Sequence, residues 1–305
     1  MPDSPTTFED DAAYRRGRVL VMISGVFFSI GGVLVRLIET AGELQIIFYR
    51  SIVLVVIILA FMAARNRMSM AAGIRAAGAT GIVAALFLAF TFIGFIFSLK
   101  HTTVANTLLL MSTASFMAAI LSWIVLGERV SRGTWAAMIA ASLGVAAMVS
   151  EGVAVGGLYG DLWALGVALA YACYTVALRR GKMIDMIPSV CLAGIFGAII
   201  SGIIAAGLQQ SLTISGHDLL ICVILGVAQL GCGLIIFTFG SRHVPAAELI
   251  LLALTEVVLA PIWVGLVVGE VPSRITLLGG GILLAAIAGQ ALSGMHRSHP
   301  RIGVV

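Results

Sequence analysis

Few side chains in this sequence could do chemistry away from water, and Glu256 is the clearest of them. It lies inside the apolar run 245–268. In a membrane-spanning helix, an ionisable group costs about 2.5–3.5 kcal/mol on insertion scales, which favours a functional reason for its presence. The carboxylate could bind a cationic or amino group of a substrate, or exchange a proton. The alternative is helix packing, with a hydrogen bond to Gln229 or Thr255.

Other polar side chains fall at a similar depth in neighbouring apolar runs. Gln229 lies at the centre of 218–240, and Tyr171 and Tyr174 lie near the centre of 160–180. A few polar groups that converge in an apolar setting are typical of a small-molecule site. The predicted substrate-binding set is Glu256, Gln229, Tyr171, Tyr174, Thr113 and Trp263.

A second set of residues could act in gating or coupling, and Glu256 belongs to it as well. Glu248 and Asn106 each lie one turn inside an apolar run, where they could hydrogen-bond the preceding loop or form a gate. Arg50 lies about two turns inside another run. It could extend its guanidinium outward or pair with a nearby acid, Glu39 or Glu43. A contact with an anionic substrate is the further interpretation for Arg50.

The elements that carry these residues belong in lipid. Of the 305 residues, 60% are hydrophobic and 10% are charged, whereas a soluble domain has roughly 25% charged residues. No soluble fold of this size could bury so much apolar surface. The apolar runs are continuous, which predicts helices and excludes a membrane barrel. They cover roughly 18–38, 44–64, 77–99, 103–126, 132–150, 160–180, 187–208, 218–240, 245–268 and 273–292.

The basic residues predict the orientation of these helices. With the N-terminus inside, 14 of the 18 Lys and Arg residues fall in cytoplasmic segments. This bias places both termini in the cytoplasm and the chain in the inner (plasma) membrane as a multi-pass protein. The four cysteines all lie in apolar runs without metal-ligand spacing, so we expect no metal and no cofactor. A nucleic-acid partner is not expected either.

A long repeat runs through the chain. Residues 100–132 align without gaps to residues 242–274, at an offset of 142, and share a Gly-Glu-x-x-Ser-Arg turn after a matching apolar run. Local ion pairs are expected to hold Glu128 and Glu270 in these turns. Because each half has five runs, an odd number, the second half must enter the membrane with opposite orientation. Inverted repeats place the substrate site near the midplane between the halves and are typical of secondary transporters.

The sequence therefore predicts an all-α membrane protein of ten helices, arranged as two inverted repeats of five. The boundaries follow from the apolar runs. We expect a disordered cytoplasmic tail over 1–17, a first repeat over 18–150, a linker over 151–159, a second repeat over 160–292 and a cytoplasmic tail over 293–305.

The chain resembles the drug/metabolite transporter superfamily, in its ten-helix EamA-domain branch. "LGERVSR" (126–132) and "VGEVPSR" (268–274) carry the resemblance, together with "TVANTLLL", "PAAELILLALTEVVLAPIW" and "IIFYRS". The resemblance implies ten helices, termini inside, a central cavity lined by both halves, and transport of small metabolites, often export, without ATP hydrolysis. The family often has a proline within the fourth helix of each half. Here Pro261 supplies it, but the aligned Ala119 does not.

The predicted function is secondary active transport of an amino acid or related amphiphilic compound by alternating access, either proton-coupled or facilitated. The partners are a small-molecule substrate and the lipid bilayer, and the protein is expected as a monomer or weak homodimer. A channel and a non-transporting structural membrane protein are the alternatives. An enzyme is not predicted, because all five histidines lie in loops or tails and no HExxH motif occurs.

Overall fold

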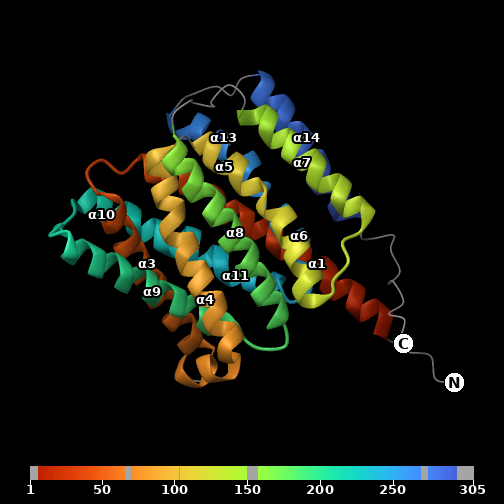
Figure 1. The fold of residues 1–305 in the computed structure, drawn as a ribbon, viewed down its shortest axis with the longest axis horizontal. Coiled ribbons are helices and arrows are strands. Elements are labelled where there is room, and N and C mark those ends of the chain that lie inside the picture. The colour runs from red at the N-terminus through yellow and green to blue at the C-terminus, as the bar shows by residue number, and fades with distance from the viewer. Residues whose placement is uncertain (1–5, 66–69, 103, 150–156, 269–273, 294–305) are drawn as a thin grey trace.

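The structure is a computed structural model that describes residues 6–65, 70–102, 104–149, 157–268 and 274–293. In these ranges every regular element is a helix, and the helices pack side by side (Figure 1). Seven described helical stretches are long and apolar enough to cross a membrane. They are Ala12–Arg36, Glu43–Ala64, Met70–His101, Thr107–Leu126, Leu158–Arg180, Ile187–Gly207 and Gly216–Gly240.

The helices fall into two groups with the same order. The first group is α1 (Thr6–Ser29), α2 (Gly31–Arg36), α3 (Glu43–Ala64), α4 (Met70–His101), α5 (Val104–Ser112), α6 (Ala114–Leu126) and α7 (Arg132–Val149). The second group is α8 (Leu158–Arg180), α9 (Ile187–Gly207), α10 (Gly216–Ile224), the π-helix η1 (Leu225–Cys232), α11 (Gly233–Gly240), α12 (Ala246–Ala253), α13 (Thr255–Val268) and α14 (Arg274–Ser293).

The contacts between helices repeat across the two groups. Two helices pack against their own counterparts, in the pairs α3 with α9 and α7 with α14 (Figure 1), and the broken fourth helices contact each other through α6 and α12. Other contacts occur in equivalent pairs: α4 packs along α8 as α11 packs along α1, and α6 packs on α8 as α13 packs on α1. This pattern is the one that a twofold relation between the halves produces.

The two groups run in opposite directions. Near the start of α1, Tyr14 donates to Glu248 in the first turn of α12. At the finish of α8, Arg179 donates to the backbone oxygen of Arg242, in the loop before α12. The start of α1 and the finish of α8 therefore lie at one end of the molecule, which we call the arginine end. The opposite end, where Asp161 and Asp218 begin α8 and α10, is called the aspartate end.

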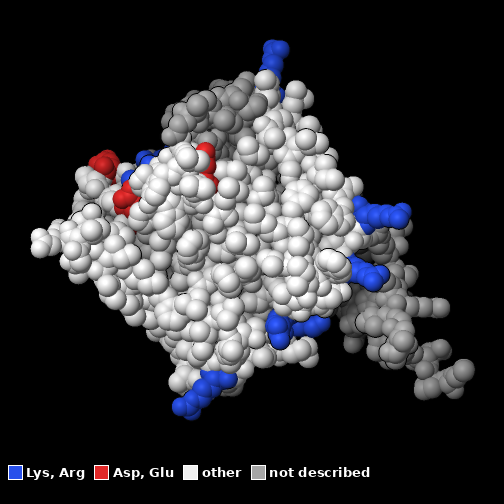
Figure 2. All heavy atoms as spheres, in the orientation of Figure 1, with Lys and Arg blue, Asp and Glu red and all other residues white. Residues whose placement is uncertain are grey.

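Charged side chains gather at the rims of the molecule. On the face shown in Figure 2, Lys and Arg lie mainly along the lower and right edges, Asp and Glu lie at the upper left, and the broad middle is uncharged. An uncharged band between charged rims is what a lipid-embedded protein presents to the bilayer.

Three helices that the sequence predicts as continuous are interrupted. The first breaks at Ile30, between α1 and α2, and the two fourth helices break at Thr113 and Leu254. A break frees backbone carbonyls, which need a partner inside a membrane. Ser and Thr hydroxyls donate to backbone oxygens three residues earlier in uninterrupted helices, as Thr175 does to Ala172 in α8, and also beside the breaks. The bonds beside the breaks join Thr113 to Leu110 (2.6 Å), Thr255 to Leu252 (2.8 Å) and Ser29 to Val26 (2.6 Å).

The N-terminal segment differs from the expected disordered tail over 1–17. Helix α1 begins at Thr6 and continues to Ser29 without interruption. Tyr14 explains part of this extension, because it packs against the buried apolar cluster and its hydroxyl donates to Glu248. The amphipathic start of α1 thereby gains tertiary contacts that the polar sequence does not suggest.

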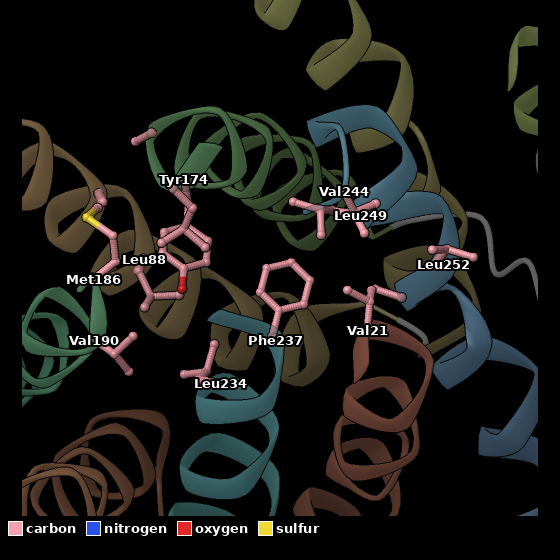
Figure 3. Packing of buried hydrophobic residues seen from close by; sticks show 14 of the residues in the cluster. Val21, Leu88, Tyr174, Met186, Val190, Leu234, Phe237, Val244, Leu249 and Leu252 are labelled. Carbon is pink, nitrogen blue, oxygen red and sulfur yellow. The ribbon is translucent and has the colours of Figure 1, made fainter. Parts of the chain in front are cut away.

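The centre of the molecule is filled with side chains from both halves. In Figure 3, Tyr174 of α8 lies beside Phe237 of α11, with Leu88 of α4 near Tyr174. Val21 of α1 lies on the other side of Phe237, towards Leu252 of α12. The central cavity implied by the resemblance is therefore largely closed in this conformation.

Candidate functional site

A small cavity remains next to the break between α12 and α13. It has room for about one water molecule. Its walls come from α5 of the first half and from α8, α12 and α13 of the second. The lining residues are Leu108, Met111, Tyr171, Ile250, Ala253, Leu254, Glu256 and Val257.

Glu256 contributes the one charged group among the described residues that line this cavity. It lies in the first turn of α13, and its carboxylate has no hydrogen bond or ion pair with any described residue. Thr255 donates its hydroxyl to Leu252 instead. Neither partner expected for a packing role bonds Glu256, since Thr255 donates to Leu252 and no hydrogen bond joins Gln229 to the carboxylate.

Gly25 of α1 lies directly against the helix break that carries Glu256. A Cβ atom at Gly25 would lie 3.0 Å from Cβ of Thr255 and 3.2 Å from the backbone oxygen of Ala253. Contacts below 3.4 Å force the neighbour to move. Glycine therefore lets α1 of the first half approach the backbone at the cavity.

Tyr171 is the predicted residue that the structure brings to Glu256, since both line the cavity. Its ring is 6.4 Å from that of Tyr174 and 5.9 Å from that of Phe237. Phe237 also lies 6.1 Å from Phe28 of α1. Tyr174 is fully buried beside Phe237 (Figure 3) and is not among the residues that line the cavity. We call Phe28, Tyr171, Tyr174 and Phe237 the aromatic cluster.

Gln229 and Trp263 lie near the break in the first helix, away from the cavity lining. Gln229 belongs to the π-helix η1 and is only 5% exposed, and its Oε1 atom has no hydrogen bond. Its carboxamide packs on Gly31, where an added Cβ would overlap Nε2 at 1.8 Å. Trp263 donates its indole N–H to the hydroxyl of Ser29 at 2.7 Å. The structure therefore brings neither Gln229 nor Trp263 to the cavity that Glu256 lines.

The predicted Thr113 has a structural contact instead of a place in the cavity wall. Its hydroxyl donates to the backbone oxygen of Leu110 at the break between α5 and α6. No group of three described His, Cys, Asp or Glu residues lies close enough together to hold a metal ion.

The candidate gating residues have different environments. Glu248 accepts a hydrogen bond from Tyr14 at 2.5 Å, so it joins the second half to α1. Arg50 is 1% exposed, donates to the backbone oxygen of Phe92 and lies over that residue's ring. The predictions that Arg50 extends outward or pairs with an acid are wrong, because α4 and α10 enclose it. The side chain of Asn106 is outside the described part of the structure.

The sequence analysis missed an ion pair at the arginine end. Glu128 of the first half bonds Nε of Arg179 of the second half at 2.8 Å, where a local ion pair was expected. Arg242 lies 3.4 Å from Asp185, within the second half. The repeat-equivalent Glu270 is outside the described residues.

Asp218 at the aspartate end was also missed. Its carboxylate accepts hydrogen bonds from the loop after α2, and it is fully buried. The donors are the backbone N–H groups of Glu39, Thr40 and Ala41 and the Thr40 hydroxyl. Ser215 accepts from the Asp218 N–H and caps α10. The spacing Ser215-x-x-Asp218 was a readable signal, since Ser followed by an acid three residues later is typical of a helix start.

Comparison with known proteins identifies the family. A model of the EamA-like transporter family matches residues 15–150 and again residues 158–291. No curated protein matches. A solved structure, described only as the crystal structure of a protein, is similar with a TM-score of 0.74 and 16% sequence identity, over 92% of this chain and 99% of that one. At that identity the likeness shows the fold alone. With both repeats matched over most of its length, this chain belongs to the EamA-like transporter family, within the drug/metabolite transporter superfamily.

Proposed function

We propose that the protein is a secondary active transporter that moves a small metabolite, an amino acid or related amphiphilic compound, by alternating access. In this proposal ten helices cross the inner membrane as two inverted repeats, 18–150 and 160–292, joined by a linker over 151–159. The opposite directions of α1 and α8 and the repeated helix contacts support it.

The arginine end faces the cytoplasm in this proposal. Lys and Arg are enriched in cytoplasmic loops of membrane proteins, and Arg65, Arg179 and Arg242 all lie at this end, after α3, at the finish of α8 and before α12. Helix α1 begins there and α14 finishes on the same side (Figure 1), which supports cytoplasmic termini.

One observation carries the proposal, namely an unpaired carboxylate in a cavity beside a broken helix, with walls from both halves. Transporters place substrate and coupling-ion sites at such discontinuous helices near the midplane. Glu256 is the group that binds the substrate's amino group or the coupling proton. Tyr171 faces the same space, and separation of the halves widens it for the substrate.

The contacts at the two ends suggest what opens and closes. At the arginine end, Tyr14 with Glu248 and Arg179 with Glu128 join the halves. At the aspartate end, the loop after α2 binds Asp218, and Thr102 donates to Asp161 at 2.7 Å. A molecule held at both ends corresponds to an occluded state. If the contacts at one end broke while those at the other end stayed formed, the cavity would open to one side of the membrane at a time.

The remaining gating candidates have supporting roles in this proposal. Arg50 of α3 donates to the backbone oxygen of Phe92 and so joins α3 to α4. Asn106 occupies the repeat position equivalent to Glu248, near the opposite end of the molecule.

Counterflow in liposomes tests the transport proposal. Purified protein is reconstituted as a monomer or weak homodimer, and labelled amino acids and amines are offered against an internal pool of the same compound. Saturable counterflow is the expected result. Ion conductance without saturation would identify a channel, and neither activity would identify a structural protein.

A gate variant tests the mechanism separately. Tyr14→Phe removes one contact between the halves and should make a cysteine introduced by Val244→Cys more accessible to a polar thiol reagent, because Val244 is fully buried. Tyr159→Phe is the matched control, since Tyr159 is 55% exposed at the other end of the molecule. Equal labelling in both variants would contradict a gate at Tyr14.

A further inference from the structure

The cavity wall holds an acidic side chain but no basic one among the described residues. Glu256 is its one charged residue, and no described Lys or Arg lines the cavity. On α8, Arg179 lies eight residues after Tyr171, at the arginine end, where it already binds Glu128 and a backbone oxygen. In its ionised form, a carboxylate in an apolar site needs a counter-charge, and the walls do not provide one.

The rest of the wall favours a cation with an apolar body. The ring of Tyr171 faces the same space as the carboxylate, and an aromatic face attracts a cation within about 6 Å. Leu108, Ile250 and Val257 add aliphatic surface. Met111 adds a flexible thioether, which adapts to irregular apolar groups.

A substrate carboxylate would find no cationic partner there. An ionised carboxylate moved from water into an apolar site without a cation or several donors carries a large desolvation penalty. It would also lie close to Glu256, where like charges repel. The same walls therefore accept an amine and disfavour the zwitterion that carries the same side chain.

We infer that the substrate site selects organic amines or ammonium ions that lack a carboxylate, with the cationic nitrogen at Glu256 and Tyr171 and an alkyl or aryl body against α5 and α12. The inference rests on the proposed transport function and narrows its substrate class. Within the class proposed above, it favours the related amphiphilic amines over free amino acids.

Three compounds with one body and different charges test the selection. Phenethylamine carries the amine alone, phenylalanine adds a carboxylate, and 3-phenylpropionate carries the carboxylate alone. Binding to the purified full-length protein is measured by calorimetry. We expect phenethylamine to bind at least about tenfold more tightly than phenylalanine, and 3-phenylpropionate to show no binding.

Substitutions at Glu256 test whether its carboxylate causes the preference for amines. Glu256→Gln should weaken phenethylamine binding by about tenfold or more and remove its advantage over phenylalanine. Glu43→Gln, which alters an acid in the first turn of α3 outside the cavity lining, should leave binding unchanged. Glu256→Asp should restore part of the selectivity. If Glu256→Gln fails to fold, the preference of the natural chain among the three compounds still decides the question.

The outcomes separate this inference from transport itself. Counterflow of phenylalanine that exceeds that of phenethylamine would overturn the amine selection and leave transport standing. Selective, Glu256-dependent binding of phenethylamine without counterflow of any compound would support the site and overturn transport. Equal binding of all three compounds, or no binding of phenethylamine at millimolar concentration, would overturn the inference.

Discussion

The fourth helices of the two halves share one type of backbone break and differ in the residue beside it. In the first half, Thr113 lies between the end of α5 and the start of α6, and its hydroxyl donates to the backbone oxygen of Leu110. In the second, Thr255 donates to the backbone oxygen of Leu252 where α12 gives way to α13. Donors and acceptors are related by the repeat offset of 142 residues. The two breaks, at Thr113 and Leu254, lie within one residue of equivalent positions.

The next position in each helix separates the halves chemically. Ala114 is fully buried and packs with Ala168 and Ala172 of α8, which closes the first break. Glu256, at the equivalent position, lines the cavity. The helix that faces this break is α1, whose Gly25 lies against Thr255 and the backbone oxygen of Ala253. The halves thus differ at the residue after the threonine: an alanine is packed in the first half, and a carboxylate lines a cavity in the second.

The largest effect should follow from moving the acid into the first half. Ala114→Glu would bury a carboxylate where alanines already fill the space. We expect a loss of about 3 kcal/mol or more in the free energy of unfolding, from overpacking and from burial of an unpaired charge. Thermal unfolding in detergent measures it, with Ala114→Ser as the control of similar volume. A stable Ala114→Glu variant would mean that the two breaks have interchangeable surroundings.

Loss of the acid in the second half should affect transport rather than folding. Glu256→Gln removes a charge that has no partner among the described residues, so we expect unchanged or higher thermal stability. We expect counterflow to fall by about tenfold or more, because a charged contact of about 1.5–3 kcal/mol is lost. Reduced stability with normal counterflow would instead assign Glu256 to helix packing.

Much of the fold could be predicted from the sequence. The apolar runs are long enough to cross a membrane, and a helix satisfies the hydrogen bonds of its own backbone, which few other structures can do in lipid. The repeat was visible from the Gly-Glu-x-x-Ser-Arg turns, and the family match covers both copies. The breaks were not predicted, since Ser and Thr are common in apolar runs. Their bonds to carbonyls three residues earlier depend on local geometry that composition does not encode.

The sequence could predict how deep in the membrane the candidate site residues lie, but not which neighbouring helix each side chain faces. Glu256 and Tyr171 share a cavity, whereas Gln229 at a similar depth packs on Gly31. Which face of a helix meets which neighbour depends on packing between the halves, and a run that is apolar all round has no amphipathic stripe to reveal it. Contacts such as Glu128 with Arg179 join residues far apart in the sequence, so local spacing could not predict them.

A moderate effect should follow from filling the space that lets α1 approach the second break. Gly25→Ala would place Cβ 3.0 Å from Cβ of Thr255, and we expect a loss of about 1–2 kcal/mol in the free energy of unfolding. Gly281→Ala is the matched control, because no atom lies within 4 Å of a Cβ atom added there. It should be neutral or slightly stabilising. Equal unfolding temperatures for the two variants would mean that α1 does not rest on the break.

The smallest effects should be equal in the two halves. Thr113→Ala and Thr255→Ala each remove one hydroxyl that bonds a carbonyl of its own helix, at an expected loss of about 0.5–1.5 kcal/mol. Because the two bonds are equivalent, the unfolding temperatures should fall by similar amounts, and the double variant should show their sum. Counterflow should separate them, because Thr255 adjoins Glu256 and Thr113 adjoins Ala114. A drop in transport for Thr113→Ala as large as for Thr255→Ala would show that both breaks, and not the acid alone, take part in transport.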